Sequence, residues 1–76
     1  MTPYRNLSGT SGIAAYAITP ESIHVRFKHG DTPNYLYDVA SSGRQHVEAM
    51  QALALAGQGL STYIARHVQS RYARCW

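Results

Sequence analysis

The clearest alternation of apolar and polar residues in this chain lies over residues 22–28. Apolar residues occupy positions 23, 25 and 27 and polar residues the positions between them, a period of two that is typical of a strand with one buried face. Segments 13–18 and 34–39 are also rich in apolar and aromatic residues. Thr19-Pro20-Glu21-Ser22 suits a type I turn, because proline fits its second position, and residues 29–33 suit a loop. The pattern predicts three consecutive antiparallel strands.

The pairing of these strands supports the prediction. A turn at 19–22 sets Ile18 opposite Ile23, and a loop at 29–33 sets Phe27 opposite Tyr35. This register gathers nine apolar or aromatic side chains on one face, namely Ala14, Tyr16, Ile18, Ile23, Val25, Phe27, Tyr35, Tyr37 and Val39. We therefore interpret the two tyrosines as core residues, in preference to an exposed platform for stacking bases. On the other face the register sets His24 opposite Asp38.

Two helices are expected after the strands. Ser42 and Gln45 have the spacing of a capping box, which predicts the start of a helix. An apolar stripe at positions 47, 50, 53 and 54 continues this helix until Gly57 and Gly59 end it. Apolar residues at 60, 64 and 68 predict a second, short helix. We expect an α+β domain in which a three-stranded antiparallel β-meander is followed by two helices packed on one face (β-β-β-α-α).

The ends of the chain lack a regular pattern. Residues 1–12 are rich in Thr, Ser, Gly and Asn, so we expect a flexible N-terminal lead there. Residues 13–72 form the single predicted domain, and residues 73–76 a C-terminal tail. A chain of 76 residues buries only a modest core, so self-association is also compatible with its size.

The net charge of +3 is placed unevenly. Bases and acids balance over residues 1–59, whereas residues 60–76 carry Arg66, Arg71 and Arg74 and no acid. The single cysteine, Cys75, excludes an internal disulfide and suits a reducing compartment. No apolar run is long enough for a membrane span, so we expect a cytoplasmic protein.

The sequence contains no arrangement typical of catalysis. The sequence has no motif that would pair a nucleophile with a base, or one carboxylate with another. The four histidines are dispersed and lack the spacing of metal ligands. We therefore expect neither an enzyme nor a bound metal or cofactor.

Two binding functions remain open. The first is nucleic-acid binding, in which arginine and lysine contact phosphates and aromatic rings stack on bases. Its candidate residues are Arg26, Lys28, Arg66, Arg71, Tyr72, Arg74 and Trp76. The second is a homodimer or protein interface on the sheet face formed by Ile13, Ala15 and Leu36. A purely structural tail, with arginines at a helix C-terminus and an anchoring Trp76, is a third interpretation of residues 66–76.

The order and spacing of several short elements resemble a known family. These are Ser11 ahead of Ile13, the Val25-Arg26-Phe27 strand with Gly30 after it, and Tyr35 and Tyr37, followed by Gly57, Gly59, Ile64 and Tyr72. Over residues 11–72 the chain resembles the KTSC domain, a small bacterial domain also found at the C-terminus of some lysyl-tRNA synthetases. The resemblance implies an association with RNA, because the family also occurs attached to a tRNA synthetase. Ser61 departs from the asparagine common in such domains, and Ala40-Ser41 from their proline-containing helix entry.

Overall fold

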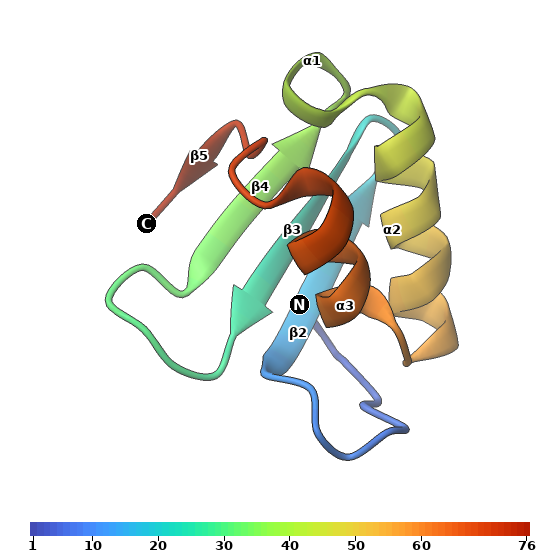
Figure 1. Ribbon diagram of the computed structural model, residues 1–76, viewed down its shortest axis with the longest axis vertical. Coiled ribbons are helices and arrows are strands. Elements are labelled where there is room, and N and C mark those ends of the chain that lie inside the picture. Colours follow the sequence, from blue (N-terminus) through green and yellow to red (C-terminus); the bar gives the residue numbers. More distant parts are fainter.

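A computed structural model describes all 76 residues as a five-stranded antiparallel sheet with helices on one side (Figure 1). The strands lie in the order of the chain: β1 (Thr2–Pro3), β2 (Ile13–Thr19), β3 (Ser22–Phe27), β4 (Asn34–Asp38) and β5 (Arg74–Cys75). The predicted α+β class is confirmed, and the three expected strands form the centre of the sheet. Each end of the chain adds one further two-residue strand at an edge, which the sequence pattern did not predict.

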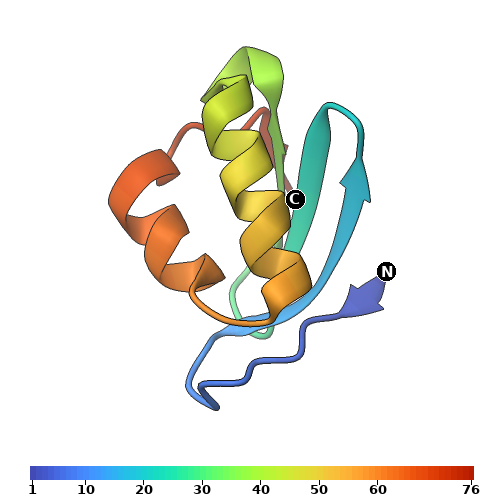
Figure 2. The same cartoon turned by 90° about the vertical axis from the view of Figure 1, so that its right-hand side faces the viewer.

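The helices cover one face of the sheet and leave the other uncovered (Figure 2). They are α1 (Val39–Ser42), α2 (Arg44–Ala56), α3 (Leu60–Tyr63) and the π-helical turn η1 (Ile64–Val68). α2 ends as predicted at Gly57, whose φ of +77° is a left-handed conformation that favours glycine. The predicted second helix is present as α3 and η1, with Leu60, Ile64 and Val68 buried.

The predicted capping box at Ser42 is wrong. The chain turns into a helix earlier, at Asp38, whose carboxylate accepts a hydrogen bond from the backbone N–H of Ser41 at 2.8 Å. Ser42 lies inside α1, is buried, and donates its hydroxyl to the carbonyl of Arg71 at 2.7 Å. α2 then starts after Gly43 with no side-chain cap. Ser42 thus ties α1 to the C-terminal segment.

The register of the first hairpin agrees with the prediction at Ile18–Ile23 and Tyr16–Val25. Beyond this point an irregularity between Ile13 and Ala15 brings Ile13, in place of Ala14, opposite Phe27. An extra residue in one strand changes the face to which the preceding side chains point. Ile13 is therefore fully buried in the core, and its predicted place on the interaction face is wrong.

The second hairpin is displaced by two residues from the predicted register. Tyr35 lies opposite Val25 and Tyr37 opposite Ile23, and His24 faces Leu36 in place of Asp38. A shift of two residues keeps every side chain on its own face, because side chains alternate with a period of two. The assignment of faces was therefore correct for Tyr35 and Tyr37, whereas the cross-strand partners were wrong.

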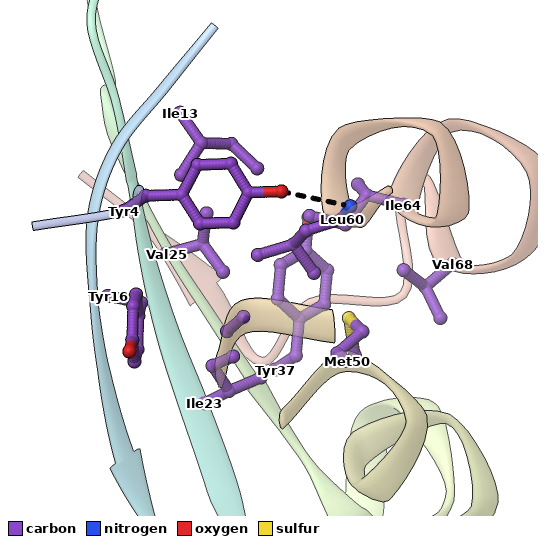
Figure 3. Packing of buried hydrophobic residues seen from close by; sticks show 11 residues of the cluster. Tyr4, Ile13, Tyr16, Ile23, Val25, Tyr37, Met50, Leu60, Ile64 and Val68 are labelled. Carbon is purple, nitrogen blue, oxygen red and sulfur yellow. Dashed lines mark hydrogen bonds between the residues drawn. The ribbon is translucent and has the colours of Figure 1, made fainter. Parts of the chain in front are cut away.

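The expected flexible lead is wrong for its first residues, because they belong to the fold. β1 pairs with β2, and the ring of Tyr4 enters the core between the sheet and α3 (Figure 3). The Tyr4 hydroxyl accepts a hydrogen bond from the backbone N–H of Leu60 at 3.3 Å. The core that surrounds it also contains Ile13, Tyr16, Ile23, Val25, Tyr37, Met50, Ala54, Leu60, Ile64 and Val68.

Candidate nucleic-acid interface

The uncovered side of the sheet presents one set of side chains, which we call the open face. The observed register places on it, strand by strand, Ala15, Ala17, His24, Arg26, Asn34, Leu36, Arg74 and Trp76. Lys28 follows Arg26 in the same alternation just beyond β3. The face thus has a small apolar strip with basic and aromatic residues beside it.

Trp76 reaches this face because the end of the chain pairs with β4. Its backbone N–H donates to the carbonyl of Asn34, and its carbonyl accepts from the N–H of Asn34, both at 3.0 Å. The centroid of the indole ring lies 4.9 Å from the centroid of the His24 ring. The guanidinium carbon of Arg74 lies 4.7 Å from the same indole centroid. The ring is thus positioned by its neighbours, while 44% of the residue stays exposed.

A short hydrogen-bond chain supports the same corner of the sheet. The side-chain amide of Asn34 donates to the carbonyl of Trp76 at 3.2 Å, so its oxygen points the other way. That oxygen lies 3.0 Å from Nε2 of His24 and can only accept, so Nε2 carries the proton. His24 and Asn34 therefore position the C-terminal tail, a role that their place on this face did not indicate in the sequence.

Three of the four acidic side chains of the chain have a partner of their own. Glu21 and Glu48 each lie 3.9 Å from the guanidinium of Arg44, and Asp38 caps α1. The only other acid, Asp31, lies in the exposed loop between β3 and β4. Arg26, Lys28 and Arg74 form no ion pair and are exposed. Their charge is available for an anionic partner.

The predicted nucleic-acid residues do not form one site. The open face brings together Arg26, Arg74 and Trp76, with Lys28 at its border. Arg66 is exposed on η1 in the helical layer, and Arg71 lies beside α1 through the bond of its carbonyl to Ser42. The difference arises because the chain turns sharply after Val68 and crosses from the helical layer to the edge of the sheet (Figure 1).

Tyr72 belongs to an aromatic cluster on the helical side of the sheet. Its ring centroid lies 5.0 Å from that of Tyr35 and 6.4 Å from that of Tyr37, in edge-to-face arrangements. Burial raises the pKa of Tyr37 to about 12, with smaller contributions from its neighbours Tyr35, Tyr72 and Cys75. The pKa of Tyr72 is also raised, first through its interaction with the Cys75 thiol. Tyr72 is thus on the opposite side of the sheet from Trp76.

A pocket lies against this cluster, and nothing in the linear pattern indicated it. It has a volume of about 610 Å³ and is bounded by the β3–β4 loop, the cluster and the end of η1. Its lining residues are Gly12, Phe27, His29, Gly30, Asp31, Thr32, Tyr35, Tyr37, Ile64, Gln69, Ser70 and Tyr72. These residues come from three separate stretches of the chain, at residue 12, over 27–37 and over 64–72, so only the folded structure brings them together.

The structure contains no group of three or more His, Cys, Asp or Glu side chains that could hold a metal ion. One polar contact joins the two helical elements, where Nδ1 of His46 lies 2.6 Å from the hydroxyl of Tyr63. The ring of His67 packs beside it, with its centroid 4.4 Å from that of Tyr63. None of the helices has the length and apolar character that a membrane span requires.

Comparison with known proteins identifies no relative. No family model matches the chain, and no curated protein or solved structure is significantly similar to it. The resemblance to the KTSC domain therefore stays a prediction from the sequence.

Proposed function

We propose that the protein is a non-catalytic module that binds single-stranded RNA across its open face. The observation that carries the proposal is the corner formed by Trp76, Arg74 and Arg26, where an exposed aromatic ring lies among unpaired cations. Proteins that bind single strands combine these two features, because any base can stack on a ring while cations follow the phosphates. The choice of RNA over DNA rests on the resemblance to the KTSC domain.

Each residue of the corner has its own part in the proposal. Trp76 stacks on a base with the exposed part of its indole ring, and His24 and Arg74 support the ring from the sheet. Arg26, Lys28 and Arg74 contact successive phosphates. Arg66, Arg71 and Tyr72, which the sequence had suggested for the same role, lie elsewhere and are not part of the proposed site.

Trp76 is the only tryptophan of the chain, so its fluorescence reports on the open face alone. We expect a short single-stranded RNA of mixed sequence to quench this fluorescence at low salt. If three phosphates are neutralised, the logarithm of the affinity should fall with the logarithm of salt concentration with a slope of about −2.

Two double variants with equal charge test the location. Arg26→Gln with Arg74→Gln removes two cations from the open face, and Arg66→Gln with Arg71→Gln removes two from the helical side. We expect the first pair to weaken RNA binding about tenfold or more and to make the salt slope shallower by about 1.4, since two phosphate contacts are lost. The second pair should change the affinity less than about twofold, through long-range charge alone. Equal effects of both pairs, measured by anisotropy of a labelled RNA, would contradict the proposed site.

A protein interface on the same face is the alternative, because Ala15, Ala17 and Leu36 form a half-buried apolar strip there. An apolar interface responds little to salt, whereas phosphate contacts respond strongly. Sedimentation at several concentrations distinguishes the two. A stable dimer whose Trp76 fluorescence is unaffected by RNA would favour the interface and refute RNA binding.

A further inference from the structure

The pocket against the aromatic cluster is a second candidate site, on the opposite side of the sheet from Trp76. Its volume of about 610 Å³ is within the range of small-molecule sites, which are concave, largely apolar and edged by a few polar groups. The rings of Phe27, Tyr35 and Tyr72 are only partly buried, so part of their surface is accessible. We propose that this pocket binds a single planar heteroaromatic ring of the nucleobase type.

The arrangement of the rings offers a flat ligand both faces and edges to pack against. Here the ring centroids of Phe27 and Tyr35 are 5.5 Å apart and those of Tyr35 and Tyr72 are 5.0 Å apart, in edge-to-face contact. Neighbouring rings thus stand roughly at right angles and present both faces and edges to the pocket. A planar ring can stack on one of these faces with its own edge against the next ring.

The polar residues of the pocket suit an uncharged base. The edge carries the carboxylate of Asp31, the amide of Gln69 and the hydroxyls of Thr32 and Ser70, all exposed at the mouth. A carboxylate only accepts hydrogen bonds, so it complements the ring N–H and amino groups of guanine. The pocket contains no arginine or lysine, the residues that most often hold a phosphate, and His29 is its only side chain that can carry a positive charge. The ligand class is thus a base or nucleoside, and the site does not depend on the open face.

The test uses guanosine, which has a base and a sugar but no phosphate. We expect it to shift the amide NMR signals of Gly30, Thr32, Gln69 and Ser70 in the labelled full-length protein, with little dependence on salt. Trp76 should not respond, because it lies on the other side of the sheet. Failure of RNA to bind the open face would leave this result unchanged, so the two proposals can fail separately.

Two variants locate the binding. Ser70→Phe places a ring at the mouth of the pocket and should weaken guanosine binding at least tenfold, whereas Ser8→Phe, at an exposed serine outside the pocket, should not change it. Asp31 lies in an exposed loop, so Asp31→Asn should leave the fold intact. It should weaken guanosine binding roughly tenfold, because the amide no longer offers two oxygen acceptors to the N–H groups of guanine. Absence of shifts at millimolar guanosine would overturn the proposal. Stronger binding of choline than of guanosine at the same signals would also overturn it.

Discussion

The two faces of the sheet use the same strands for different purposes. On the covered face, Ile23, Val25 and Tyr37 are buried under α2, α3 and η1. On the open face, their neighbours His24, Arg26 and Leu36 remain half-buried or exposed. The two ends of the chain show the same division. Tyr4 enters the core just after β1 (Figure 3), whereas Trp76 lies on the open face just after β5. The comparison shows that the face an aromatic residue near a chain end reaches decides its role. On the covered face it stabilises the core, and on the open face it stays exposed and can contact a ligand.

The largest expected effect is at the covered face. Tyr4→Ala should lower the free energy of unfolding by about 3–5 kcal/mol, because it empties a core site and leaves the N–H of Leu60 without its partner. Leu7→Ala, at an exposed leucine of the same N-terminal segment, should cost less than about 0.5 kcal/mol. Urea unfolding measures both. An equally small loss for Tyr4→Ala would mean that the N-terminal segment lies outside the fold.

The next effect is a pH dependence of stability that arises from Tyr37 on the covered face. The pKa of Tyr37 is about 12 in the folded protein against 10.0 for the free side chain. As the pH rises from 10 to 12, the unfolded chain loses this proton while the folded protein keeps it, so the free energy of unfolding decreases. The stabilisation is fully present below pH 10, and roughly 2–3 kcal/mol of it is lost by pH 12.

Tyr37→Phe is the control for this pH dependence. It removes the titrating hydroxyl and keeps the ring, so the decrease in stability between pH 10 and 12 should become shallower. Thermal unfolding of both proteins across this range measures the difference. Parallel curves would show that Tyr37 ionises as readily in the folded protein as in the unfolded chain.

The smallest effect on stability is expected at the open face. Trp76→Ala keeps the backbone bonds to Asn34 and removes only the contacts of the ring with His24 and Arg74. It should lower the free energy of unfolding by about 0.5–1 kcal/mol, while weakening RNA binding by about 1–3 kcal/mol through the lost stacking. Urea unfolding and RNA anisotropy measure the two effects. A loss of stability as large as that of Tyr4→Ala would assign Trp76 to the core.

The sequence determined the features that depend on local periodicity. Alternation over β3 separated Val25 and Phe27 from His24 and Arg26, and the apolar spacing of residues 47–54 and 60–68 predicted both helical segments. The faces of Tyr35 and Tyr37 were also predictable, even though their partners were not, because a shift of two residues leaves a face unchanged.

Tertiary structure alone decided the features that depend on distant segments. A single irregularity in β2 moved Ile13 from the open face to the core, and the residue types at this position do not predict such an irregularity. Two-residue strands are too short to show a period, so the pattern of apolar and polar residues could not predict β1 and β5. Their pairing with β2 and β4 buried Tyr4 and separated Arg74 from Arg71. The pocket likewise joins residues that are far apart in the sequence, such as Gly12, Phe27 and Tyr72. Local periodicity thus assigned each side chain to a face, whereas pairing between distant segments decided which residues meet in a site.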